Sequence, residues 1–468
     1  MTGTLLASFL ALMASGLPVA LAMASASLIY VMATGTVPDF VVIHRMVNGV
    51  DSFPLLAVPF FILAGNLMNT AGITNRIYNF ALALVGWMKG GLGHVNVVGS
   101  MIFSGMSGTA IADAAGLGTI EIKAMRDHGY PIEFSVGVTA ASATLGPIIP
   151  PSLPFVIYGM MANVSIGQLF LGGVLPGLFM SVLMMLTVAY YAHTRGYGSD
   201  AAFSWLRLSK ATLEIIVVLG FPLSVWLMTL VDVSANWAVG IAFVILLGLD
   251  WIFSFSAVMA LMAPVILIGG MTMGWFTPTE AAVAAVVWAL FLGLVRYRSM
   301  SWRMLVKASM DTIETTSTVL LIVAAASIFS WLLTVTHVAE WIANAVLSLT
   351  SSPAMFLLLA NLLMLFVGCF LETTAAILIL VPILMPIVLK LGIDPVHFGL
   401  VMVLNLMIGL LHPPLGMVLF VLARVANLSV ERTTVAIIPW LVPLLLSLIA
   451  ITYVPEITLW LPRQFFKG

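Results

Sequence analysis

Long apolar runs, separated by short polar stretches, fill almost the whole chain. In the first half they lie at residues 4–33, 53–71, 77–103, 109–122, 134–161 and 165–193. In the second half they lie at residues 213–231, 236–258, 259–275, 278–295, 317–336, 339–349, 354–371, 374–391, 396–411, 414–428 and 435–461. A helix needs roughly 20 mainly apolar residues to cross a bilayer, so several runs are too short to span alone. The pattern predicts an all-α membrane protein with spanning helices, residues 4–33 forming one of them, and with re-entrant hairpins and interrupted helices.

One apolar run is broken by prolines. The stretch "ATLGPIIPPSLP", residues 143–154, contains Pro147, Pro150, Pro151 and Pro154. Each proline removes a backbone donor and clashes with a preceding carbonyl. In hydrocarbon an unsatisfied carbonyl costs several kcal/mol, so irregular chain persists only where it is buried in protein or lines a cavity. The freed carbonyls therefore need partners, and a cation is a suitable one; a pair of purely structural kinks is the alternative.

The second half repeats this arrangement. "FSGMSGTA", residues 103–110, precedes Pro150-Pro151 as "FLETTAAI", residues 370–377, precedes Pro413-Pro414. The first proline of each pair is followed 26 residues later by another proline, with an Asn-x-Ser step between them in both halves. Matching order and spacing predict an internal duplication.

Composition agrees with a membrane location. Of the 468 residues, 62% are hydrophobic and only 7% are charged, and the mean hydropathy is +1.18. A soluble domain carries about a quarter charged residues, so no sizeable soluble domain and no nucleic-acid partner is expected. The single cysteine, Cys369, rules out an intramolecular disulfide and is expected to pack in the interior.

The basic residues indicate orientation. One cluster lies between residues 195 and 210 and another between residues 296 and 307. By the positive-inside rule both face the cytoplasm. One follows the first repeat and the other precedes the second, so the two repeats are predicted to insert with opposite topology. "FSWLRLSKA" and "MSWRMLVKA", one in each cluster, are expected either as helices lying at the interface or as ordinary loops with aromatic anchors.

Hydroxyl and acidic groups follow the same repeat. Ser104, Ser107 and Thr109 lie in a glycine-rich membrane segment that offers hydroxyl and carbonyl oxygens, which hard cations prefer. The counterpart contains Glu372, an intramembrane acid of the kind that is usually functional. The alternatives are close helix packing by small residues for the first segment and a paired, structural carboxylate for Glu372.

Other polar residues have more than one interpretation. Asp113 is either a coupling group or a structural cap, and His412 is either a ligand or a satisfied structural group. Glu280 is expected to be an N-terminal helix acid that the helix dipole stabilises. Residues 59–73, with a polar break at Gly65-Asn66, are expected to form the tip of a re-entrant hairpin. The histidines are scattered and no catalytic constellation is present, so we expect no enzyme.

The chain resembles a known family. "PFFILAGNLM", "FSGMSGTAIAD", "ATLGPIIPPS", "GWFTPTEAA", "FLETTAAILILVPIL" and "HPPLG", in that order, closely resemble the large membrane subunit of TRAP transporters, the DctM type. An additional pair of apolar segments near residues 213–263 departs from the family pattern. The resemblance implies sodium-coupled uptake of an organic anion, such as a carboxylate or sialic acid, across the bacterial inner membrane by an elevator mechanism. It also implies a small four-helix membrane subunit and a periplasmic substrate-binding protein as partners.

The resemblance also implies site residues. The first sodium site would use oxygens of Ser104, Ser107, Gly108 and Thr109 with carbonyls near Gly146 and Pro150. The second would use Glu372, Thr373 and Thr374 with carbonyls near Gly409 and His412. The substrate would lie between them near Asn66, with Ser107, Thr374 and His412 as further candidate ligands.

The predicted organisation has five sections. They are an N-terminal scaffold helix and loop (1–50), transport repeat 1 (51–193), a cytoplasmic and scaffold section with the additional helices (194–316), transport repeat 2 (317–434) and a C-terminal scaffold helix (435–468). Two alternative functions stay open: a related ion-coupled carboxylate carrier that works without a binding protein, and a membrane-embedded enzyme.

Overall fold

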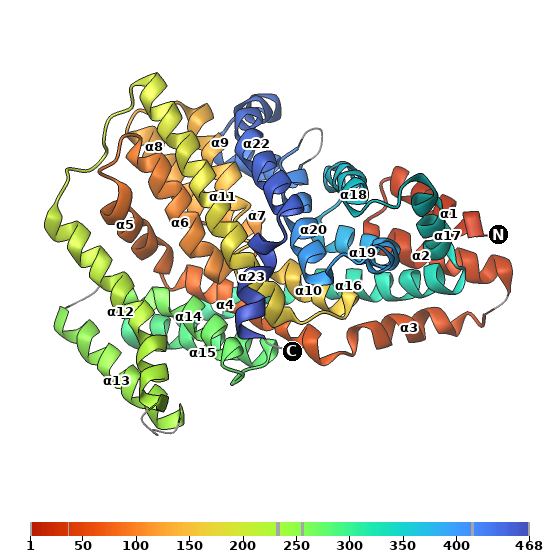
Figure 1. Cartoon of the computed structure of the whole chain (residues 1–468), viewed down its shortest axis with the longest axis horizontal. Helices are drawn as coiled ribbons and strands as arrows, with labels where there is room; N and C mark the ends of the chain where they lie inside the picture. The colour runs from red at the N-terminus through yellow and green to blue at the C-terminus, as the bar shows by residue number, and fades with distance from the viewer. Residues whose placement is uncertain (1, 36, 231–234, 254–256, 413–415, 467–468) are drawn as a thin grey trace.

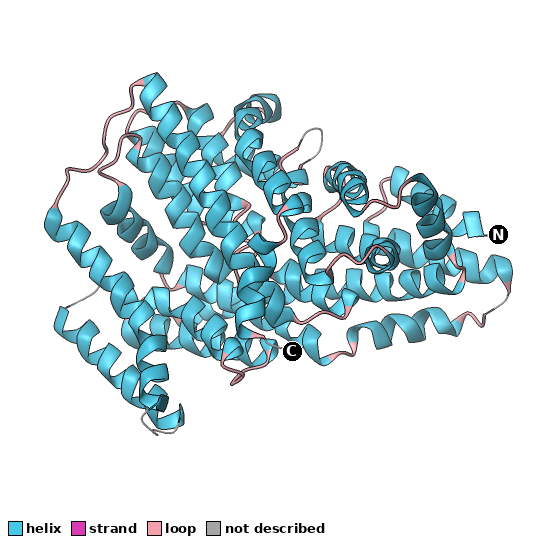
Figure 2. Cartoon of the chain, in the orientation of Figure 1, coloured by secondary structure: helices cyan, strands magenta, loops and turns pink. Residues whose placement is uncertain are grey.

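The chain is helical throughout its regular structure (Figure 2). The computed structural model describes residues 2–35, 37–230, 235–253, 257–412 and 416–466, and these ranges contain no β-strand. Seven helices in them are long and apolar enough to cross a membrane, and many shorter apolar helices accompany them. The predicted class, an all-α polytopic membrane protein, is confirmed.

The N-terminal section differs from its prediction. Instead of one span over residues 4–33, two helices pack along each other, α1 (Thr2–Ala14) and α2 (Val19–Thr34). Gly16 has a φ of +88° and Pro18 precedes α2, so the chain turns between them. Apolar composition alone did not reveal this turn. α3 (Phe40–Val50), the short η1 (Phe53–Leu56) and α4 (Ala57–Thr70) follow.

The first repeat contains a helical hairpin and a broken helix. Between α6 (Gly91–Ser107) and α8 (Leu117–Asp127), the side chains of Asn96 and Glu121 meet and Gly99 faces Leu117. The two helices therefore run antiparallel around a tip near residues 108–116. The broken helix consists of α9, an irregular segment at residues 144–152, and α10. The helices of this section are α5 (Ile73–Val85), α6 (Gly91–Ser107), α7 (Ala110–Ala115), α8 (Leu117–Asp127), α9 (Ile132–Ala143), α10 (Leu153–Ala162) and α11 (Ile166–Arg195).

The middle section carries a projecting helix pair and the longest helix. α12 (Trp205–Leu230) and α13 (Ala235–Phe253) pack on each other and extend from the lower left of the molecule in Figure 1. α14 (Val258–Thr272), α15 (Pro278–Leu290) and the π-helical η2 (Phe291–Arg296) follow. α16 (Trp302–Val335) then packs against α2, α3 and α4. The two Ser-Trp stretches are the starts of the long helices α12 and α16, not separate interfacial helices.

The second repeat has the same order of elements. It comprises α17 (Val338–Leu349), α18 (Pro353–Gly368), α19 (Thr373–Lys390), α20 (Pro395–Gly409), α21 (Met417–Ala426) and α22 (Val430–Tyr453), and the separate α23 (Glu456–Phe465) ends the chain. The apolar run at 435–461 is therefore split between two helices. The section boundaries drawn after residues 193, 316 and 434 fall inside the continuous helices α11, α16 and α22.

The helix ends before and after each Asn-x-Ser step have the same backbone conformation in both repeats. Asn163 and Asn427 end α10 and α21 with φ of +54° and +53°, a left-handed conformation that asparagine tolerates better than most residues. Two residues later, Ser165 and Ser429 cap the N-termini of α11 and α22 through their side-chain oxygens. Equal turns at equivalent positions confirm the internal duplication.

The repeats have opposite orientation. Near the C-terminus of α11, Tyr191 stacks on Trp440, which lies in the first half of α22. Near the N-terminus of α11, Gly172 contacts Thr458 and Pro462 of α23, which follows the C-terminus of α22. The equivalent helices α11 and α22 are thus antiparallel, as the arrangement of basic residues predicts.

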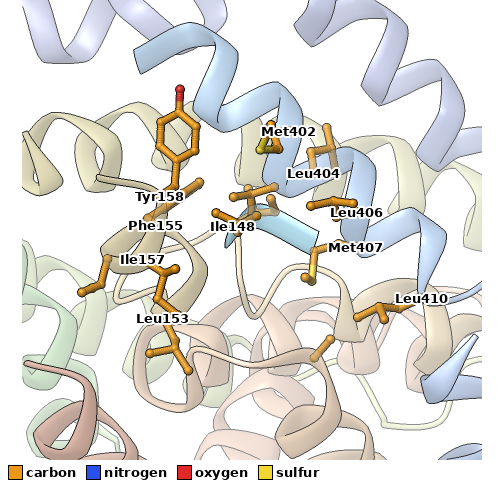
Figure 3. Packing of buried hydrophobic residues seen from close by; sticks show 14 of the residues in the cluster. Ile148, Leu153, Phe155, Ile157, Tyr158, Met402, Leu404, Leu406, Met407 and Leu410 are labelled. Carbon is orange, nitrogen blue, oxygen red and sulfur yellow. The ribbon is translucent and has the colours of Figure 1, made fainter. Parts of the chain in front are cut away.

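Each repeat packs its short half-helix, α10 or α21, against the other repeat, and we call these two helices the exchanged half-helices. α10 of the first repeat packs on α19 and α20 of the second, and α21 of the second packs on α7 and α9 of the first. Figure 3 shows Phe155 and Tyr158 of α10 beside Met402 and Leu404 of α20. The Tyr158 hydroxyl donates to the carbonyl of Pro395 at 2.6 Å. Because lipid tails are as apolar as these side chains, the contacts stabilise the protein through close packing rather than through removal from water.

Candidate ion sites

The first candidate site lies where the tip of the hairpin meets the break between α9 and α10. A methyl group built on Gly108 would lie 2.9 Å from the carbonyl oxygen of Pro151. One built on Gly146 would lie 3.2 Å from the carbonyl oxygen of Thr109. Glycine at both positions therefore lets the two irregular segments approach through their backbones. The carbonyl oxygens of Pro151 and Thr109 thus each lie beside the facing segment.

The hydroxyl groups of this site are partly engaged. Ser104 is buried and donates to the carbonyl of Met101 at 2.6 Å, which leaves the lone pairs of its oxygen as acceptors. Thr109 is half-buried at the start of the tip. The side chain of Ser107, the last residue of α6, lies outside what the structure describes. The structure brings Ser104, Gly108, Thr109, Gly146 and Pro150 into one region.

A serine that the sequence analysis did not select supports the same break. Ser152 accepts a hydrogen bond from the Phe155 amide at 3.3 Å and thereby caps α10. Its hydroxyl donates to the carbonyl of Pro147 at 2.5 Å, so one of the freed carbonyls is satisfied within the chain. The signal was present in "PPSLP", because serine is a preferred N-cap and proline is favoured in the first helical turn.

The second candidate site surrounds the N-terminus of α19. The Glu372 carboxylate accepts hydrogen bonds from the amides of Thr374 at 2.9 Å and Ala375 at 3.3 Å, and from the Thr374 hydroxyl at 3.1 Å. It is the N-cap of α19, where the helix dipole favours a negative charge. Thr373 and Thr374 are buried beside it.

Gly409 approaches this site from α20. A methyl group built on Gly409 would lie 2.7 Å from the Gly368 Cα atom, so α18 and α20 cross in backbone contact one turn from Glu372. His412 is exposed, and its Nδ1 atom lies 3.5 Å from the sulfur of the buried Cys369. Pro413-Pro414, the second double proline, lies outside the described residues. The structure thus groups Glu372, Thr373, Thr374 and Gly409, with His412 at the edge.

The predicted hairpin tip at residues 59–73 is wrong. α4 is continuous through Gly65-Asn66, because a single glycine and asparagine do not interrupt a helix that packs along α15 and α16. The Asn66 side-chain amide donates to the Thr312 hydroxyl of α16 at 2.9 Å. The hairpin of the first repeat is formed by α6 and α8 instead.

Two acids behave differently from each other. Glu280 forms a capping box with Thr277 at the start of α15, which confirms its expected structural role. Asp113 lies in α7 and is buried, and neither of its carboxylate oxygens has a hydrogen-bond partner among the residues that the structure describes. It does not act as a cap.

Glu121, equally buried on α8, was not selected by the sequence analysis, although it lies within the apolar run at residues 109–122.

Interrupted helices in two inverted repeats are the architecture of many secondary transporters of the membrane. The sequence pattern of the DctM component of tripartite ATP-independent periplasmic transporters matches residues 6–457. This chain belongs to that family, and its place is the bacterial inner membrane.

Individual relatives agree with this membership. The sialic acid TRAP transporter large permease protein SiaM of Vibrio cholerae is 40% identical over 457 residues, covering 98% of this chain and 97% of that protein. The C4-dicarboxylate TRAP transporter large permease protein DctM of Rhodobacter capsulatus is 33% identical, with 97% of each chain covered.

Two solved transporters share the fold at low sequence identity. YdaH of Alcanivorax borkumensis has a TM-score of 0.57 and is 12% identical, with 88% of this chain and 86% of that chain covered. MtrF of Neisseria gonorrhoeae, which belongs to a class of antimetabolite efflux pumps, has a TM-score of 0.56 and is also 12% identical, with 88% and 83% covered. At this identity the likeness concerns the fold alone.

Proposed function

We propose that this permease couples the inward movement of an organic anion to sodium ions. The observation that carries the proposal is the matched pair of oxygen-rich clusters, one in each inverted repeat, at breaks in the helices. Carbonyl oxygens line the first cluster around Gly108 and Gly146, and the Glu372 carboxylate is the centre of the second. Hard monovalent and divalent cations prefer such ligands.

The proposed ligands follow the two clusters. At the first site they are the oxygens of Ser104, Ser107, Gly108 and Thr109 with carbonyls near Gly146 and Pro150. At the second they are Glu372, Thr373 and Thr374 with carbonyls near Gly409 and His412. The sodium ion would complete the coordination of carbonyls that the helix breaks leave without intrahelical donors.

The substrate is proposed to lie between the two ion sites. α10 and α21 begin at the two breaks, so their N-termini present partial positive charge to an anion. Asn66, Ser107, Thr374 and His412 are the proposed side-chain ligands, although the Asn66 amide donates to Thr312 in this structure. The relatives above, a sialic acid permease and a C4-dicarboxylate permease, suggest a substrate of one of these two classes.

The exchanged half-helices support an elevator mechanism, which is part of the proposal. Since α10 packs on α19 and α21 packs on α7, the two ion sites belong to one packed unit that can move as a body. α2, α3 and α4, packed on α16, would form the scaffold against which it moves. A small four-helix membrane subunit and a periplasmic substrate-binding protein are the proposed partners.

Uptake into proteoliposomes tests the proposal. We expect uptake of labelled sialic acid or succinate only when the permease, the small subunit, a cognate binding protein and an inward sodium gradient are all present. Uptake that persists without the binding protein would favour a carrier that works alone. Uptake that is indifferent to sodium would reject the coupling.

A further inference from the structure

A buried polar cluster lies in the first repeat, between its hairpin helices and α9. It is formed where α6, α8 and α9 pack on one another, in the upper left of the molecule in Figure 1. Six of its side chains are buried, at most 2% exposed, and none belongs to the two candidate sites: Asn96, Ser100, Asp113, Glu121, Thr139 and Ser142.

Hydrogen bonds connect most of the cluster. The Asn96 amide donates to a carboxylate oxygen of Glu121, Oε2, at 2.6 Å and lies 2.8 Å from the Thr139 hydroxyl. The Ser142 hydroxyl donates to the side-chain oxygen of Asn96 at 2.7 Å, and Ser100 donates to Ser142 at 3.1 Å. The side chains are therefore held in a fixed arrangement of oxygen atoms.

Among the described residues, three carboxylate oxygens in this arrangement have no hydrogen-bond partner. They are both oxygens of Asp113 and the Oε1 atom of Glu121. The Ser100 hydroxyl lies near Asp113, and the two carboxylates are within electrostatic range of each other. Within the described ranges, none of the ion pairs involves either acid. Two buried carboxylates without a counter-charge are costly in a protein interior. A bound cation would supply the missing positive charge.

The second repeat shows that the packing does not require acids. Asn405 lies eight residues before the first proline of its pair, as Ser142 does in the first repeat. Its amide donates to the backbone and side-chain oxygens of Asn361 at 3.0 and 2.8 Å, and Asn361 donates to Thr452 at 3.0 Å. Neutral amides connect α18 and α20, the equivalents of α6 and α9, and the Thr452 hydroxyl joins them from α22. The packing of these helices therefore does not require a buried acid.

We propose that Asp113 and Glu121 hold a third cation, a sodium ion, at this cluster. Its ligands would be the three unpartnered carboxylate oxygens, with the hydroxyls of Ser100 and Thr139 nearby. On α6, Ser100 precedes Ser104 of the first site by four positions, which is about 6 Å along the helix. The inference rests on the sodium coupling of the proposed function and adds a site to it.

Binding of ²²Na⁺ to the purified full chain tests this site without any substrate. We expect Glu121→Gln to bind one sodium ion fewer per chain at saturation than the wild type. Glu314→Gln is the matched control, because Glu314 is an exposed carboxylate on α16 outside all three sites, and it should bind as many ions as the wild type. Equal binding by wild type and Glu121→Gln would overturn the third site.

A second variant keeps the charge. A methyl group built on Gly99 would lie 2.8 Å from the Oε1 atom of Glu121, so Gly99→Ala displaces this oxygen and fills the space beside it. We expect Gly99→Ala to bind one sodium ion fewer, as Glu121→Gln does. This variant tests the site even if Glu121→Gln does not fold. Retention of every ion by a folded Gly99→Ala protein would also contradict the site. A wild-type chain that bound no sodium would instead reject the proposed coupling itself.

Discussion

Glu372 has two separable roles, which substitution by alanine can distinguish. Its carboxylate caps α19 through two backbone amides, and we propose that it also binds sodium. Glu372→Ala removes both functions. Ser429→Ala removes only a cap, because the Ser429 oxygen accepts from the Arg432 amide at the start of α22, away from the proposed ion sites.

The expected magnitudes differ between these two variants. Loss of an N-cap costs about 1 kcal/mol of stability, so both proteins should melt at slightly lower temperatures. Loss of an interaction with a charged group costs about 1.5–3 kcal/mol. At 1.4 kcal/mol for each factor of ten, Glu372→Ala should raise the sodium concentration for half-maximal uptake by roughly 10- to 100-fold. Ser429→Ala should leave this concentration unchanged.

The assay is uptake into proteoliposomes at a fixed substrate concentration over a series of external sodium concentrations. Melting temperatures of both variants in detergent serve as the stability control. A wild-type sodium curve for Glu372→Ala would refute Glu372 as a sodium ligand. An equal shift of the curve for Ser429→Ala would refute it as well.

Three further outcomes are expected. Joint replacement of Ser107 and Thr109 by alanine should abolish uptake while the protein still inserts in the membrane, as measured by its recovery in membrane fractions; normal uptake would refute the first site. Gly409→Ala should force the facing backbones of α18 and α20 apart and cost about 1–3 kcal/mol, and an unchanged melting temperature would contradict this crossing. Tyr158→Phe removes the bond to the Pro395 carbonyl and should cost about 1 kcal/mol by thermal unfolding, with uptake retained.

The repeat was predictable because local backbone geometry dictates its residues. A left-handed helix end favours asparagine at residues 163 and 427, an N-cap favours serine two residues later, and a helix break favours proline. Such preferences act within a few residues and are therefore visible in the sequence. The same reasoning predicted the role of Glu280 at the start of α15.

Features that depend on contacts between distant segments were not predictable in this way. The turn at Gly16 and the continuity of α4 through Gly65-Asn66 involve residues that are compatible with either outcome. Packing against other helices decides between them, and hydropathy does not report packing. Glu121 was missed for the same reason, since only the fold shows that α6 and α9 enclose its side chain.

The exchanged half-helices also determine when the molecule can finish folding. α7 is synthesised early, but the helix that covers it, α21, lies close to the C-terminus. The first repeat therefore stays incomplete in the bilayer while most of the remaining chain is made. Assembly of the transport unit must follow synthesis of nearly the whole protein, and neither half of the chain contains the contacts needed to complete it alone.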